Sequence, residues 1–195
     1  RSLAALMPDE PEAIGLLALM LLSEARTAAR HVDGGLVLLV DQDRSRWDRA
    51  LIAEGHDLVR RCIRRDRPGP YQLQAAIQAV HCAAKTFEET DWDQIVTTYD
   101  QLSAILPTPV VLLNRAIALG ERDGPNAALD AIEDIATDLA TYHPLHAARA
   151  TMLRRLGRLD ESRAAFEEAA RLAPTLVAQH SIASQIDELI AAGAG

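Results

Sequence analysis

The feature that most constrains this chain is an internal repeat, because residues 109–174 resemble themselves at a spacing of 34 positions. Small or apolar residues recur at matching places in the two copies: Ala116 and Ala150, Leu119 and Leu153, Ala128 and Ser162, Ile132 and Phe166, and Ile135 and Ala169. A period of this length is typical of a pair of antiparallel helices that stacks on its neighbours. The pattern therefore predicts stacked helical hairpins.

The same period is that of the tetratricopeptide repeat, so we predict an all-α, right-handed solenoid of about four helical hairpins plus a terminal helix, with one short extended insertion. The regular part should hold helices at residues 109–120, 126–140, 144–156 and 159–172. A last helix, residues 175–192, would cap the stack. Such solenoids hold other molecules and rarely do chemistry, so the fold predicts an interaction module.

The first part of the chain is less regular. A helix is expected over residues 11–29, because Pro11 suits a first helical position. Gly34 and Gly35 then break the pattern, and residues 36–40 form an apolar stretch that we expect to be extended, with no obvious second strand beside it. Ser45 and Asp48 resemble a capping box that opens a helix running to about residue 65.

A third hairpin is predicted from helices at residues 71–84 and 92–106, with Asp91 as the cap of the second. It resembles a degenerate repeat, because Ile95, Tyr99 and Leu102 stand 33 residues before three core positions of the next hairpin. We therefore predict a single domain over residues 1–195, divided into an irregular hairpin with an insertion (1–70) and tetratricopeptide-like repeats with a capping helix (71–195).

Charge and cysteine content narrow the class of partner. The formal net charge is −8, and an acidic chain is a poor nucleic-acid binder, so we expect no direct contact with DNA or RNA. Cys62 and Cys82 match no metal spacing and are interpreted as reduced thiols, buried or half-buried, in the cytoplasm. No apolar run reaches the length of a membrane span, so no membrane contact is expected.

Metal sites are weakly indicated. Asp41, Asp43 and Ser45 alternate like the start of a calcium loop, but Arg46 and Ile52 occupy the positions that need glycine and glutamate. His143 and His146 have a spacing that can hold zinc, yet no further ligand lies near them in sequence. We predict no metal at either place.

Catalytic patterns are also weak. His81 and Cys82 are adjacent, so on a helix they point about 100° apart and do not form a dyad. No triad and no phosphate-binding loop stands out. We therefore expect no catalytic residues, no cofactor and no enzyme activity.

The densest polar segment supplies the main candidate for partner binding. Its candidate residues are Asp41, Asp43, Arg44, Arg46, Trp47 and Asp48. Two interpretations stay open: a structural network, in which the three aspartates pair with Arg44, Arg46 and Arg49 around a buried Trp47, or a projecting loop with an arginine or tryptophan anchor.

A second candidate patch lies at the end of the same predicted helix. It consists of Arg60, Arg61, Arg64 and Arg65. Cations are favoured at a helix C-terminus by the helix dipole, which is one explanation of the cluster. The other is a docking patch for an acidic partner surface.

Several segments resemble a known family. They are residues 11–22, 36–48, 69–77, 109–116 and 142–149, and the 41–48 run is the most specific. Together they look like the tetratricopeptide-like C-terminal extension of extracytoplasmic-function RNA polymerase sigma factors. The resemblance covers nearly the whole chain.

The resemblance implies a regulatory, protein-interacting C-terminal domain of an alternative sigma factor, which directs RNA polymerase to promoters. Expected partners are the sigma domains of the same protein, the polymerase core and a signalling protein. Because Arg1 and the residues after it read like the end of a helix, we expect the chain to be a fragment that lacks the sigma domains. The alternative is a stand-alone tetratricopeptide adaptor that clamps a peptide, for which Asn114 and Arg115 give limited support.

Overall fold

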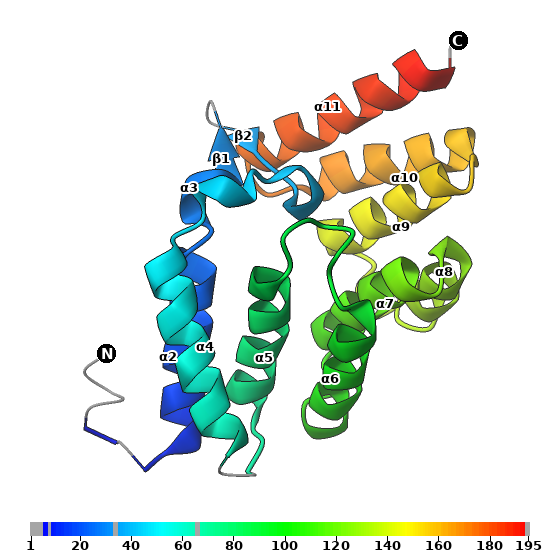
Figure 1. Cartoon of the computed structure of the whole chain (residues 1–195). Coiled ribbons are helices and arrows are strands. Elements are labelled where there is room, and N and C mark those ends of the chain that lie inside the picture. The colour runs from blue at the N-terminus through cyan, green and yellow to red at the C-terminus, as the bar shows by residue number, and fades with distance from the viewer. Residues whose placement is uncertain (1–5, 8, 33–34, 65–66, 194–195) are drawn as a thin grey trace. The chain divides into compact units, whose positions relative to one another are not determined.

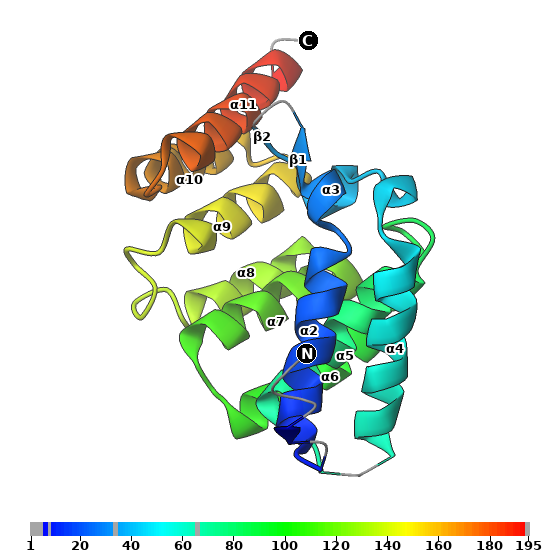
Figure 2. The same ribbon diagram turned by 90° about the vertical axis from the view of Figure 1, so that its left-hand side faces the viewer.

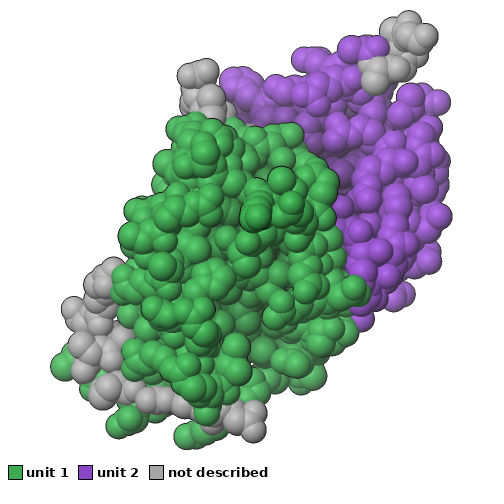
Figure 3. Space-filling view, in the orientation of Figure 1, with its two compact units in different colours: residues 1–32, 37–107 green, residues 33–36, 108–195 purple. Residues whose placement is uncertain are grey.

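The computed structural model describes residues 6–7, 9–32, 35–64 and 67–193 (Figure 1). The chain divides into two compact units, shown in different colours in Figure 3. Unit 1 contains residues 1–32 and 37–107, and unit 2 contains residues 33–36 and 108–195. The described elements are almost entirely helical and pack as hairpins, which confirms the all-α class and is compatible with a tetratricopeptide-like solenoid.

Unit 1 is built around the apolar helix α2. Its elements are α2 (Pro11–Glu24), α3 (Thr27–Arg30), β1 (His31–Val32), the 3₁₀ turns η1 (Leu39–Asp41) and η2 (Arg44–Arg46), α4 (Arg49–Ile63), α5 (Pro70–Ala83) and α6 (Trp92–Ile105). Helix α2 packs against both α4 and α5, and α5 packs against α6 (Figure 1). A helix that is apolar on most sides needs neighbours on more than one of them, so α2 lies at the centre of the unit's core.

The helices of unit 1 begin where local chemistry allows. Pro11 and Pro70 stand at first helical positions, where the missing N–H costs nothing. The carboxylate of Asp48 accepts hydrogen bonds from the Ala50 and Leu51 amides, and that of Asp91 accepts one from the Gln94 amide. These side chains satisfy donors that have no partner inside the helix.

Glu12 fastens the start of α5 from a distance of about 60 residues in sequence. Its carboxylate accepts hydrogen bonds from the Tyr71 amide at 3.0 Å and from both the amide and the side chain of Gln72. An anion at a helix N-terminus is favoured by the dipole. The close approach of α2 and α5 depends on Gly15, because a Cβ there would lie 2.7 Å from the Gln72 backbone nitrogen.

Unit 2 holds the regular hairpins. Its elements are β2 (Gly35–Leu36), α7 (Pro109–Arg122), α8 (Pro125–Glu133), α9 (His143–Arg155), α10 (Leu159–Leu172) and α11 (Leu176–Gly193). Figure 2 shows α7 to α11 following one another in chain order. The pairs α7–α8 and α9–α10 start 34 residues apart, and all ten residues of the sequence echo are buried. The predicted repeat is thus confirmed in this unit.

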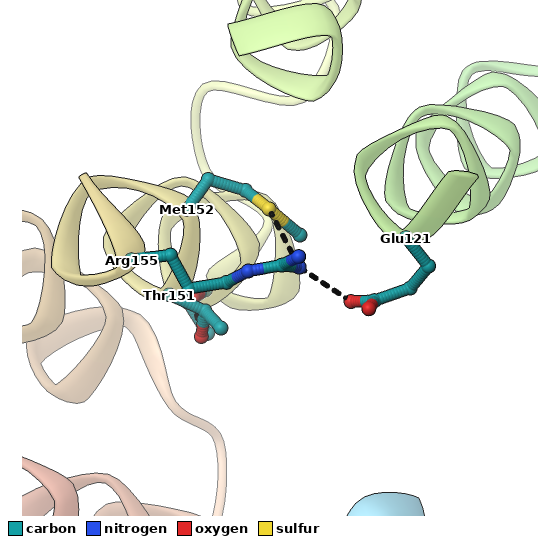
Figure 4. Close-up of polar contacts among 5 residues, drawn as sticks. Glu121, Thr151, Met152 and Arg155 are labelled. Atoms are coloured by element: carbon teal, nitrogen blue, oxygen red, sulfur yellow. Dashed lines mark hydrogen bonds and ion pairs between the residues drawn. The ribbon is translucent and has the colours of Figure 1, made fainter. Parts of the chain in front are cut away.

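One contact joins successive hairpins, and another holds together the two helices of a single hairpin. Arg155 on α9 and Glu121 on α7 stand 34 residues apart and form an ion pair with an N–O distance of 2.7 Å. Figure 4 shows the two side chains pointing toward one another. Within the second hairpin, the fully buried Ser162 hydroxyl on α10 donates to the Ala150 carbonyl of α9 at 2.8 Å. Positions one repeat apart therefore meet across adjacent hairpins, as a repeat architecture requires.

The structure differs from the sequence prediction at four places. The helix expected over residues 11–29 is interrupted, because α2 ends at Glu24 and the separate helix α3 begins at Thr27. Helix α8 ends at Glu133 and the chain continues as turns to Thr141, whereas a helix to residue 140 was expected. The segment 36–40 is not wholly extended, since it contains part of β2 and the start of η1, and a second strand, β1, precedes it. The cap of α4 is Asp48, and Ser45 lies in the separate turn η2.

The hairpin formed by α5 and α6 lies in unit 1, although the repeat pattern associates it with the later hairpins. Its predicted core positions Ile95 and Leu102 are buried, and Tyr99 is half-buried. Among the described residues, no helix is long and apolar enough to cross a membrane.

Candidate interaction surface

The polar run 41–48 is a turn that closes unit 1, and its aspartates cap the backbone. Asp43 accepts a hydrogen bond from the Ser45 amide at 2.9 Å. Hydrogen bonding with the Ser45 side chain, and then with this amide, holds the pKa of the Asp43 carboxyl below the usual value. Asp48 caps α4, and its own amide donates to the Ala25 carbonyl just after α2. Asp41 and Arg46 are exposed. The run therefore ties the end of α2 to the start of α4.

Arg44 is the central side chain of this turn and is buried. Its Nη1 donates to the carbonyls of His81 and Ala84, at 2.8 Å each. These carbonyls belong to the last turn of α5 and the residue after it, where no partner exists inside the helix. Arg44 thus caps the C-terminus of α5, a place where the helix dipole favours a cation. Burial lowers the pKa of its guanidinium.

Trp47 is a core side chain with two guanidinium groups over its ring. It is 3% exposed, and the guanidinium carbons of Arg44 and Arg26 lie 4.7 and 5.7 Å from its ring centroid. Arg26 also donates to the Gln78 side-chain oxygen at 2.8 Å. His81 completes the group, since its pKa is lowered to about 4 by burial and then by the charges of the two arginines. We call Arg26, Arg44, Trp47 and His81 the buried arginine cluster.

These contacts distinguish in part between the two interpretations of the 41–48 run, a structural network and a projecting binding loop. Trp47 is a buried packing residue, as the structural interpretation predicted. The predicted ion pairs are replaced by backbone hydrogen bonds: over the residues that the structure describes, no ion pair joins Asp41, Asp43 or Asp48 to the arginines of the run. Because Arg44 and Trp47 are inside the unit, the candidate residues of the run that remain exposed to a partner are Asp41, Asp43, Arg46 and Asp48.

The second predicted patch lies at the open end of α4. Arg60, Arg61 and Arg64 are exposed, and Arg65 lies outside the described residues. Arg60 forms an ion pair with Asp57 one turn earlier, so its charge is partly neutralised. Arg61 and Arg64 add two further exposed positive charges to this surface.

Exposed apolar side chains lie at the same end of unit 1. Ile63 is 68% exposed at the end of α4, and Tyr71 is 44% exposed at the start of α5. These ends meet near the start of α2, because Cys62 contacts the Pro11 carbonyl and Tyr71 bonds to Glu12. We call Arg61, Ile63, Arg64 and Tyr71 the basic end. Arginines beside exposed aromatic and aliphatic side chains are typical of protein-binding surfaces.

The weaker candidates have ordinary structural contacts. His146 Nε2 lies 2.8 Å from the Ala140 carbonyl, and His143 opens α9. The described residues contain no group of three or more side chains that could hold a metal ion. Cys62 and Cys82 are both buried, and burial raises the pKa of the Cys82 thiol. His81 stacks edge-on against Trp92, with ring centroids 5.4 Å apart.

Sequence reasoning missed Arg26 and Glu12. Both lie on or next to α2 and act on α5, so no local pattern connects them with their partners. One signal was present for Arg26: it is the first basic residue after a long apolar helix, at a point where a charged side chain must find polar partners or solvent.

The chain is similar in sequence to known proteins whose functions are not described. Residues 1–63 match the model of DUF6596, a family of unknown function. The chain is 44% identical over 192 residues to "Uncharacterized protein R00370" of Rhizobium meliloti, an alignment that covers 98% of this chain and 45% of that protein. No solved structure matches. The chain therefore spans less than half the length of this curated relative.

Proposed function

We propose that this chain is the regulatory, protein-interacting C-terminal domain of an alternative sigma factor. The observation that carries the proposal is its similarity to a longer protein, in which the aligned segment makes up 45% of the length. More than half of that relative lies outside the aligned segment. We propose that this remaining part holds the domains that bind polymerase and promoter.

The described residues support a binding role over a catalytic one. The titratable groups with the most unusual surroundings, His81 and the two buried arginines, are enclosed by the fold and hold helices together. A general acid or base must reach its substrate, and its pKa must lie near the working pH. His81, with a pKa near 4 and 9% exposure, meets neither condition.

The basic end is the surface that we propose for contact with the rest of the sigma factor or with polymerase. It combines Arg61 and Arg64 with Ile63 and Tyr71, and each of the four is exposed. The net charge of −8 favours a protein partner over nucleic acid, because the rest of the surface would repel phosphates. An acidic patch with an apolar centre on the partner would complement this end.

The test is promoter-dependent transcription by the Rhizobium meliloti relative with core RNA polymerase. We expect the intact relative to direct transcription, and deletion of the segment aligned with this chain to change the amount or the regulation of the transcript. Charge reversal at the residues aligned with Arg61 and Arg64 should reproduce the effect of the deletion. The matched control reverses the residues aligned with Arg163 and Arg171, exposed arginines on α10. Equal transcript from all proteins would refute the regulatory role.

A second candidate is a stand-alone tetratricopeptide adaptor. The observation that favours it is the regularity of unit 2, where two hairpins repeat with a 34-residue period and Asn114 is exposed on α7. The transcription experiment separates the two. An adaptor predicts no transcription by the intact relative under any condition, and it predicts peptide binding that is lost on changing Asn114.

A further inference from the structure

The buried arginine cluster contains N–H donors that have no acceptor. Among the described residues, the buried side-chain atoms that lack a hydrogen-bond partner are Arg26 Nε, Arg44 Nη2, Trp47 Nε1, His81 Nδ1, Gln42 Oε1 and Thr90 Oγ1. The first three are N–H donors of the cluster. The three side chains are 8%, 8% and 3% exposed. Buried polar groups are nearly always paired, and each unpaired donor costs about 1 to 3 kcal/mol, so three in one place require an explanation.

The cluster also carries positive charge without a counter-charge. Arg26 and Arg44 both lie over the same Trp47 ring, and within the described ranges neither guanidinium is ion-paired with a carboxylate. Burial lowers the pKa of Arg26, and the charges of Arg30 and then Arg44 lower it further. Glu88 and Glu89 act on Arg44 electrostatically, but both are exposed. Buried charges are normally paired, so an acceptor that also carries negative charge fits best.

We propose that the buried arginine cluster binds one small monovalent anion, such as chloride, which accepts hydrogen bonds from Arg26 Nε, Arg44 Nη2 and Trp47 Nε1. A water molecule could accept from these donors, but it would leave the two charges uncompensated. The donor atoms have almost no exposed surface, so an acidic side chain from a protein partner is disfavoured. The inference does not depend on the proposed function.

Such an anion would join three segments of unit 1. Arg26 follows α2, Arg44 lies in η2 and also caps the end of α5, and Trp47 leads into α4. Because a ligand that binds only the folded state stabilises it, the stability of unit 1 should depend on the anion. The 41–48 run, with its exposed Asp41, Asp43 and Arg46, would be held more firmly when the anion is bound.

The first test is urea unfolding of the 195-residue chain in sodium chloride and in sodium gluconate at equal ionic strength, followed by tryptophan fluorescence. Gluconate is too large for an enclosed site. We expect the midpoint to rise in chloride by about 0.5 to 1 M urea at a tenfold excess over Kd. The control Arg46→Gln should show the same rise, and Arg26→Gln should show none. An equal rise in all three proteins, or no rise in the wild type, would overturn the proposal.

The second test needs no variant, so it is decisive even if Arg26→Gln fails to fold. Crystals of the wild-type chain are grown or soaked in sodium bromide, and anomalous diffraction is measured. A bromide peak within hydrogen-bonding distance of Arg26 Nε and Arg44 Nη2 is the expected result. Density for water alone, or for a carboxylate of a neighbouring copy, would show that the cluster is not an anion site.

Discussion

Replacing Arg44 with alanine is expected to destabilise unit 1 strongly. The change removes two hydrogen bonds from a charged donor, each 2.8 Å long, and leaves two carbonyls at the end of α5 without their partner. Hydrogen bonds to charged groups contribute about 1.5 to 3 kcal/mol each, and the contact with the Trp47 ring adds roughly 0.5 to 2 kcal/mol. Relief of the desolvation of a buried cation offsets part of this, which leaves a net loss of about 3 kcal/mol.

Urea unfolding followed by tryptophan fluorescence measures this loss in the correct unit, because Trp47 and Trp92 both belong to unit 1. With a slope of about 2 kcal/mol per M, the midpoint should fall by about 1.5 M urea. The matched control is Arg46→Ala, two residues away and exposed, which should change the free energy of unfolding by less than about 0.5 kcal/mol. If the two variants unfold at the same urea concentration, the assignment of Arg44 as the cap of α5 is wrong.

Three further predictions test other parts of the account. Gly15→Ala should destabilise unit 1 by about 2 kcal/mol in urea unfolding, because the new Cβ would meet the Gln72 backbone, and this outweighs the higher helix propensity of alanine. The control Met20→Ala, on the exposed side of α2, should be nearly neutral. Equal effects of the two changes would exclude the close approach of α2 and α5. Because the pKa of His81 is lowered to about 4 in the folded state, the unfolded chain takes up a proton first as the pH falls below about 6.5. The free energy of unfolding should therefore decrease by about 3 kcal/mol between pH 6.5 and 4. His81→Gln should remove this decrease, and an unchanged dependence on pH would contradict the burial of His81. A double-mutant cycle of Glu121→Gln and Arg155→Gln, in which unfolding is followed by circular dichroism, should give a coupling free energy of roughly 0.5 kcal/mol that decreases in 1 M salt. A coupling of zero at low salt would show that this ion pair does not stabilise the contact between the hairpins.

Much of the fold could be predicted from periodicity and from the residues that start and end helices. The 34-residue echo placed the hairpins of unit 2 within a few residues, because one buried face must recur with each hairpin. Pro11 and Asp91 marked helix starts for local reasons that the structure shares. Helix α8 was overestimated, since residues 134–140 keep a helical pattern of apolar residues while the backbone turns.

Fewer contacts of the candidate site than of the fold could be predicted from the sequence. The 41–48 run was identified as important, but whether Arg44 faced solvent or the core depended on α5, about 40 residues further along the chain. The same holds for Arg26 and Glu12, whose partners lie 52 to 60 residues away. Charge patterns describe which residues could pair, whereas the packing of α2 against α5 decides which ones do.

The most direct test of the proposed function is capture of RNA polymerase by the Rhizobium meliloti relative. The intact relative, carrying an affinity tag, is expressed in its own organism and purified at low salt, and the co-purifying subunits are identified by mass spectrometry. We expect the core subunits of RNA polymerase to co-purify, and we expect deletion of the segment aligned with this chain to change the amount recovered. Recovery of the intact relative without any polymerase subunit would contradict the assignment to an alternative sigma factor.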